Sequence, residues 1–218
     1  MTTPARKYMA ARAINPHLAH ELGVKLEGDD LVFPNGKRRP LSGDVRFLNG
    51  KGQPAQPWWL QNGGEEVLVC EGESDGLAAL SALRSLPADH RSGLRSLAVV
   101  AIPGNGFPLE RLTRELRGYK LAYTAFDNDD SGRAYNERAT DALVDARVRP
   151  VDLWGRGDAD ANDLAEWLAA IPEYDRGEFL AALIVDAEAV APSLKQHHAR
   201  RLAAYYRERA EEWEQLAA

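Results

Sequence analysis

The sequence contains a single cysteine, Cys70, and no apolar run long enough to cross a bilayer. One cysteine excludes an intramolecular disulfide and any zinc site built from cysteine ligands. The longest apolar runs, residues 97–102 and 179–185, are far shorter than the ~20 residues of a membrane helix. The first residues also lack the apolar stretch of a signal peptide. We therefore expect a cytoplasmic protein with no zinc and no membrane contact.

Charge is distributed unevenly along the 218 residues, whose net charge is -6. Residues 1–64 carry +4 and the remainder carries -10. A basic head on an acidic body is typical of proteins that contact nucleic acid through one part only. The ordinary alternative is a chance fluctuation of composition. With 44% hydrophobic residues, the chain has enough apolar side chains to form a folded core.

Local patterns divide the chain into three parts. Residues 1–64 predict a small α+β subdomain, with short helices at 6–13 and 16–22 and short strands at 31–33 and 44–48. Residues 65–170 predict a catalytic domain in which apolar strands alternate with helices. Residues 171–218 predict a C-terminal helical tail, whose one-sided apolar stripe from residue 192 onward would pack on the domain or on a partner.

The middle part defines the fold class. Strands are expected at 66–70, 97–102, 121–126 and 148–153, and helices at 74–86, 109–116 and 132–146. Apolar strands that alternate with helices indicate a mostly parallel sheet covered on both faces. The sequence therefore predicts an α/β domain.

Acidic side chains gather where three of these strands end. The first motif is Glu71-Gly72-Glu73-Ser74-Asp75, the second runs from Asp127 to Gly132, and the third from Asp158 to Asp163. The carboxyl ends of parallel strands meet at one edge of a sheet, where ligands bind in open α/β folds. We therefore expect these acids to form one site.

The second motif has three carboxylates within four residues, and their repulsion would be relieved by a divalent cation. Oxygen ligands favour Mg²⁺, Mn²⁺ or Ca²⁺. An EF-hand loop shares the opening of this motif, but a strand precedes it and Arg138 stands where the loop needs a glutamate. Helix capping is the ordinary alternative for each motif: a polar helix start at residues 129–131 in the second, an N-cap in the third, and a cap at Ser74 in the first. Capping explains Glu71 less well, because a carboxylate at a buried strand end is costly without a partner.

The ordered set E-G-x-x-D, D-x-D-x-x-G and D-x-N-D resembles the Toprim domain, over about residues 65–165. Bacterial and phage primases, type IA and type II topoisomerases, OLD-type nucleases and small ribosomal-RNA maturases share this domain. The resemblance implies a Toprim-type parallel sheet flanked by helices.

The preceding segment resembles the catalytic core of bacterial and phage-type primases. Residues 5–22 are similar to a helical lead with the phrase y-l-x-x-R-G-i-x, in which Ala13 replaces the glycine. Residues 31–34, 45–48 and 56–60 are similar to the phrases l-x-F-P, g-x-R-f-l and p-K-Y-L, with Trp58 in place of the lysine. In primases this basic subdomain holds the template strand.

The resemblance implies metal-dependent nucleotidyl or phosphoryl transfer with two Mg²⁺ or Mn²⁺ ions. Asp127 and Asp129 would be the main metal ligands and Asp160 would help hold a second ion. Glu71 would act as general base or share a metal, and Asp75 would orient its neighbours. Supporting roles fall to Gly72, Gly132, Asn162 and Asp163.

Basic and aromatic residues of the first part predict a nucleic-acid contact. A sequence-independent phosphate track would be formed by Lys37, Arg38, Arg39, Arg46 and Lys51. Trp58 and Trp59 would offer stacking surface for single-stranded bases. The alternatives are a solvated hairpin for the cations and a core position for at least one tryptophan.

The sequence has no Cys/His zinc ribbon and no G-x-x-x-x-G-K-[ST] motif. We therefore expect a primase-like enzyme that acts on single-stranded DNA or RNA with nucleoside triphosphates, together with a separate zinc-ribbon or helicase protein. One alternative is a Toprim nuclease or RNA-processing enzyme that uses the same acids. The other is a non-catalytic module that binds nucleic acid or a replication partner.

Overall fold

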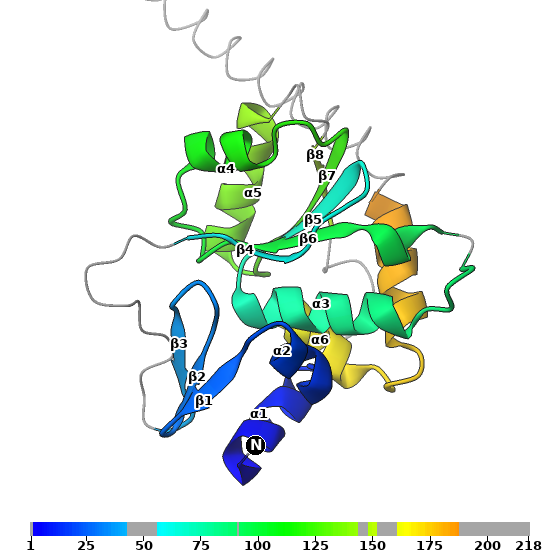
Figure 1. Ribbon diagram of the computed structural model, residues 1–218. Helices are drawn as coiled ribbons and strands as arrows, with labels where there is room; N and C mark the ends of the chain where they lie inside the picture. Colours follow the sequence, from blue (N-terminus) through cyan, green and yellow to red (C-terminus); the bar gives the residue numbers. More distant parts are fainter. Residues whose placement is uncertain (1, 43–55, 91, 144–147, 152–160, 188–218) are drawn as a thin grey trace, which may run out of the picture.

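The computed structural model describes residues 2–42, 56–90, 92–143, 148–151 and 161–187 (Figure 1). The strand expected at 44–48 and the helix expected from residue 192 onward lie outside these residues. Within the described part, no helix combines the length and the apolar character that a membrane span requires.

A five-stranded sheet forms the centre of the molecule. Its order is β4-β6-β5-β7-β8. The parallel strands β5, β6, β7 and β8 confirm the expected sheet, and β4 adds an antiparallel edge against β6. These strands are β4 (Trp58–Gln61), β5 (Glu66–Cys70), β6 (Ala98–Ala101), β7 (Leu121–Ala125) and β8 (Val148–Pro150). The boundary expected at residue 64 therefore follows a strand that already belongs to the sheet.

Strand β5 lies between β6 and β7, which makes it the point where the strand order reverses. The chain moves from β5 to β6 on one side and then crosses to β7 on the other. In open α/β sheets, ligands bind outside the carboxyl ends of the strands at this reversal. The first and second acidic motifs directly follow β5 and β7.

Helices cover both faces of the sheet because alternate strand residues point to opposite sides. Leu68 and Cys70 face one core, which also contains residues of α3 (Glu73–Ser85) and α6 (Leu164–Ala170). Val67 and Val69 face the other core, beneath α4 (Leu109–Glu115) and α5 (Asp130–Ala142). Figure 1 shows the two helix pairs on opposite faces. A 3-10 turn, η1 (Leu94–Ser96), leads into β6.

The N-terminal unit, residues 2–42, packs on the α3 and α6 face. It contains α1 (Thr3–Ala11), α2 (Pro16–Glu21) and an antiparallel sheet of β1 (Lys25–Glu27), β2 (Asp30–Val32) and β3 (Arg38–Pro40). Ala5, Met9 and Leu18 are buried in the same core as α3. The unit is therefore part of one hydrophobic core with the sheet domain.

A buried ion pair joins the β2–β3 turn to the first turn of α3. The Glu73 side chain is completely buried, and Lys37 Nζ lies 2.9 Å from its Oε2. Asn35 Nδ2 donates to Glu73 Oε1 at 2.9 Å and also to the Gln56 carbonyl. Because a buried carboxylate is costly without a partner, this contact fixes the turn against the domain.

Lys37→Met is expected to lower the free energy of unfolding by about 3–5 kcal/mol, because it leaves the Glu73 charge buried without its cation. The double variant Lys37→Met, Glu73→Gln should recover most of this loss, since no charge is then stranded. Urea unfolding of the single and double variants measures both. Arg38→Gln is the control, because Arg38 pairs with Glu27 and Asp30 at the surface and surface pairs stabilise little. A double variant no more stable than Lys37→Met would contradict the prediction.

Candidate active site

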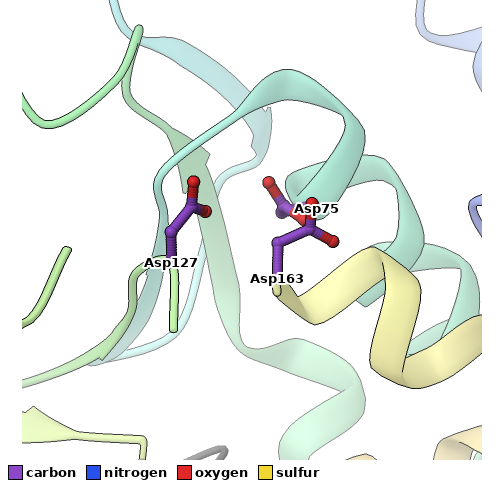
Figure 2. A group of neighbouring side chains, drawn as sticks. All are labelled: Asp75, Asp127 and Asp163. Carbon is purple, nitrogen blue, oxygen red and sulfur yellow. The ribbon is translucent and has the colours of Figure 1, made fainter. Parts of the chain in front are cut away.

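Three aspartates from different parts of the chain meet at the carboxyl end of the sheet. One carboxylate oxygen each of Asp75, Asp127 and Asp163 lies within 4.8 Å of the other two. Asp75 is in the first turn of α3, Asp127 follows β7, and Asp163 is the N-cap of α6. Figure 2 shows Asp127 on the sheet side and the other two at the starts of their helices. We call these three residues the acidic cluster.

Two further acids of the sequence analysis flank the acidic cluster. Glu71 is 7% exposed, and its Oε2 accepts a hydrogen bond of 3.0 Å from the backbone N–H of Asp127. Asp129 is exposed and caps α5, where its Oδ1 accepts from the Gly132 N–H at 2.7 Å. Glu71 therefore fixes the backbone of the second motif. Asp129 caps α5 and also lies beside the acidic cluster.

The two motif glycines allow the acids to approach the backbone. A Cβ atom on Gly132 would lie 2.2 Å from the carbonyl oxygen of Asp127, and one on Gly72 would lie 2.9 Å from Asp75 Oδ2. The loop after β7 folds directly over the first turn of α5. Only a residue without a side chain fits at Gly132 in this conformation.

Electrostatics make the site favourable for a cation. Burial, together with the charges of Glu71 and Asp163, raises the pKa of Asp127 to about 7. The pKa of Asp75 is raised well above its ordinary value by burial and by the charge of Asp163. The pKa of Glu71 is also raised, by burial and by Asp129. These carboxylates lose charge unless a cation compensates them.

Arg12 is the residue of the site that reasoning from the acids missed. It ends α1, and its Nη2 lies 2.5 Å from Asp163 Oδ2 and 3.8 Å from Asp75 Oδ1. Its Nη1 donates to Glu166 Oε1 at 3.0 Å. The signal was present in the primase-like phrase R-G, in which Arg12 is the arginine. Ala13, which replaces the glycine, has a φ of 53°, a left-handed conformation that glycine adopts without strain.

The structure describes only the second half of the third acidic motif, from residue 161 onward. Asp160, the residue expected to hold a second ion, lies outside the described residues. Asn162 is exposed, its backbone N–H donates to Glu166 Oε2 at 3.0 Å, and its carbonyl accepts from Asn128 N at 2.7 Å. Asp163, expected only in support, is the member of this motif that reaches the acidic cluster.

Three basic residues of the expected phosphate track, Lys37, Arg38 and Arg39, have partners within the protein. Lys37 pairs with Glu73, and Arg38 pairs with Glu27 and Asp30. The Arg39 guanidinium lies 5.2 Å from the centre of the Tyr8 ring. Arg46 and Lys51 lie outside the described residues.

The two tryptophans of β4 have different surroundings. Trp58 is 7% exposed, and its ring packs at a tilt against Phe33 with centroids 5.9 Å apart. Trp59 is half-buried, stacks on Tyr119 at 5.6 Å and donates from Nε1 to Glu115. The core alternative thus describes Trp58, whereas Trp59 keeps part of its surface exposed.

The chemistry of the acidic cluster fits a hard divalent cation. All of its donor atoms are carboxylate oxygens, which suit Mg²⁺ and Mn²⁺. Neither oxygen of the Asp127 carboxylate makes a hydrogen bond or ion pair with another described residue. The oxygens of Asp127 are therefore available to an ion.

Comparison with known proteins agrees with this geometry. Residues 68–165 match the Toprim-like family model. This range contains all three acidic motifs and ends in α6. No curated protein matches the sequence.

Solved structures of primase cores share the fold. The primase fragment of the bacteriophage T7 primase-helicase protein is 22% identical, with a TM-score of 0.52, over 78% of this chain and 71% of that one. The Escherichia coli primase catalytic core is 17% identical, with a TM-score of 0.51, over 88% and 78%. A DnaG primase catalytic domain bound to single-stranded DNA is 16% identical, with a TM-score of 0.54, over 88% and 76%.

Gly132→Ala is expected to destabilise the protein by about 1–3 kcal/mol, because the new methyl group meets the Asp127 backbone. This loss should outweigh the gain of about 1 kcal/mol in helix propensity. Urea unfolding measures the stability, and Mn²⁺ titration measures the damage to Asp127. Gly106→Ala, in open space, is the matched control and should be neutral. A Gly132→Ala protein as stable as the parent would contradict the close contact.

In EDTA, the protein is expected to melt at a higher temperature at about pH 6 than at about pH 8. Since the raised pKa values let the folded state hold protons that the unfolded chain has released, the stability they contribute is lost as the pH rises through about 7. Mg²⁺ should reverse the trend, because it binds the deprotonated acids. Asp127→Asn should flatten it, whereas Asp89→Asn, at an exposed position, should not. A melting temperature that rises from pH 6 to pH 8 in EDTA would refute the electrostatic account.

Proposed function

Because the chain carries a Toprim-like domain within the fold of a primase catalytic core, we propose that it is a metal-dependent nucleotidyltransferase that synthesises short primers on single-stranded DNA. The observation that carries this proposal is the acidic cluster at the strand-order reversal. Its carboxylates lie where a nucleotide would bind in an open α/β sheet.

Each acid has a distinct role in the proposed reaction. Asp127 and Asp129 would hold a Mg²⁺ or Mn²⁺ ion, and Asp160 would help to hold a second. When bound, these ions would neutralise the phosphates of the incoming nucleotide and stabilise the charge that develops in the transition state. Asp75 would keep the neighbouring carboxylates in place through its bond from the Ala165 N–H at 3.0 Å.

Glu71 is the proposed general base. The 3′ hydroxyl of the growing primer would attack the α-phosphorus of a nucleoside triphosphate, and pyrophosphate would leave as the old P–O bond breaks. Glu71 would take the proton of that hydroxyl. Its raised pKa, caused mainly by burial, makes it a stronger proton acceptor than an exposed glutamate.

Template binding is proposed for the basic segment of the N-terminal part. Arg38 pairs with carboxylates only at the surface, so it can exchange Glu27 and Asp30 for phosphates of the strand. Arg39, Arg46 and Lys51 would extend this track, with Trp59 beneath a base. The likeness to a DnaG domain that was solved with single-stranded DNA supports this choice of template. A separate zinc-ribbon or helicase protein would supply template recognition.

Primer synthesis is tested with the full chain, single-stranded DNA, labelled ribonucleoside triphosphates and Mg²⁺ or Mn²⁺. We expect short labelled oligomers, and their yield should fall by more than about a hundredfold in the variant Asp127→Asn, Asp129→Asn, because loss of a direct ligand costs more than loss of a supporting one. Asp89→Asn, which removes one exposed carboxylate in the segment after α3, is the control for loss of an acidic charge.

The same assay separates primer synthesis from the other activities of Toprim proteins. A shortened template without new oligomers would replace the proposal with a nuclease that uses the same acids. Shortening of an RNA substrate alone would indicate an RNA-processing enzyme. Binding of the strand without synthesis or cleavage, also after addition of a helicase and a zinc-ribbon protein, would leave a non-catalytic module.

A further inference from the structure

A fixed cation already occupies one side of the acidic cluster. The Arg12 guanidinium contacts Asp163 at 2.5 Å and lies 3.8 Å from Asp75. Its side chain is only 19% exposed, so the charge is applied in a poorly solvated place where it is weakly screened. Arginine stays protonated at any physiological pH, and its planar fork matches carboxylates.

The oxygen atoms of Asp75 and Asp163 are largely engaged by the protein itself. Asp163 Oδ2 accepts from Arg12 and Asp163 Oδ1 accepts from the Glu166 N–H at 2.8 Å. Asp75 Oδ1 accepts from the Ala165 N–H at 3.0 Å. Asp75 Oδ2 is the one oxygen of this pair without a hydrogen bond among the described residues. An ion held by both aspartates would therefore have to compete with the guanidinium or with the capping bond at Asp163.

On the other side of the cluster, no described cation is in contact with Asp127, and the Arg12 charge acts on it only from a distance. Within the described chain, the Asp127 carboxylate has no hydrogen-bond donor, and Glu71 and Asp129 add negative charge to its surroundings. Glu71 Oε2 accepts from the Asp127 N–H, so the Glu71 carboxylate lies against the backbone of the loop that carries Asp127. The uncompensated charge is thus concentrated around Asp127.

We propose that the Arg12 guanidinium takes the place of one of the two expected divalent ions, so that the nucleotide-free protein holds a single ion at Asp127. This inference rests on the proposed function only in that the site binds a divalent ion. The second ion of the reaction, which Asp160 would help to hold, then arrives with the nucleotide, because the triphosphate supplies the oxygen ligands that Asp75 and Asp163 have given to Arg12. Arg12 is on this account a positioning residue that sets how many ions the resting site accepts.

Mn²⁺ binding to the full chain, without nucleotide, tests the inference. Isothermal titration is expected to give one ion for the parent protein and two for Arg12→Gln, which frees the Asp75–Asp163 pair. Arg12→Lys keeps the charge and should bind one ion. Arg6→Gln, an exposed arginine of the same helix, is the matched control and should also bind one.

Two further variants locate the ion in a protein that retains Arg12. Asp163→Asn keeps an oxygen to cap α6, since asparagine is as good an N-cap as aspartate, and it should still bind one ion with less than about a threefold change in affinity. Asp127→Asn should bind none. These variants test the inference even if Arg12→Gln fails to fold, which circular dichroism would reveal.

The outcomes separate the inference from the proposed function. Two ions in the parent protein, or loss of the ion in Asp163→Asn, would overturn the inference, while metal-dependent primer synthesis would still be intact. Binding of no ion, together with no metal-dependent synthesis, would overturn both. One ion in every variant that keeps Asp127, Arg12→Gln included, would show that Arg12 does not set the count.

Discussion

The contact between the Arg12 guanidinium and two buried aspartates constrains the rest of the structure. Carboxylates at the carboxyl end of a parallel sheet are costly to bury, and among the described residues the ion pairs of Asp75, Asp163 and Glu73 are made with cations from outside the sheet domain. Arg12 reaches Asp75 and Asp163, and Lys37 reaches Glu73. Both cations come from the N-terminal unit, so ion pairs hold this unit against the sheet domain. The shared apolar core beneath α3 has the same consequence.

The charge asymmetry of the sequence therefore has a second meaning. A basic N-terminal part beside an acidic body favours nucleic-acid contact, yet Lys37 and Arg12 satisfy acids of the protein itself. Three consecutive residues of the first motif contact the N-terminal unit. Glu73 pairs with Lys37 of the β2–β3 turn, Ser74 Oγ lies 2.6 Å from the Tyr8 hydroxyl, and Asp75 lies beside Arg12. Composition reports how much charge there is, whereas only the fold reports which charges neutralise each other.

Sequence patterns predicted the parts of the structure that repeat locally. The strands β5, β6 and β7 are short apolar runs, and the acids that follow them are adjacent in the chain, so both were visible. The strands β1, β3 and β4 were missed because three or four residues carry no clear period and pair with distant partners. Arg12 was missed for the same reason, since Asp163 is 151 residues away along the chain. Asp163 was expected only in a supporting role, because an N-cap is the ordinary explanation of the third motif and its distant partners cannot be read from the loop.

The position of β4 has a consequence for how the chain folds during synthesis. This strand is made before β5, and its partner among the described strands is β6, so that pairing cannot form until β5, α3 and β6 have followed it from the ribosome. The ion pair between Arg12, at the end of α1, and Asp163 forms later still, because Asp163 lies at the start of α6. Long-range closure of this kind is slow, and it exposes unpaired strand edges meanwhile. The N-terminal unit is thus synthesised before the sheet domain, yet its contacts with that domain are among the last to form.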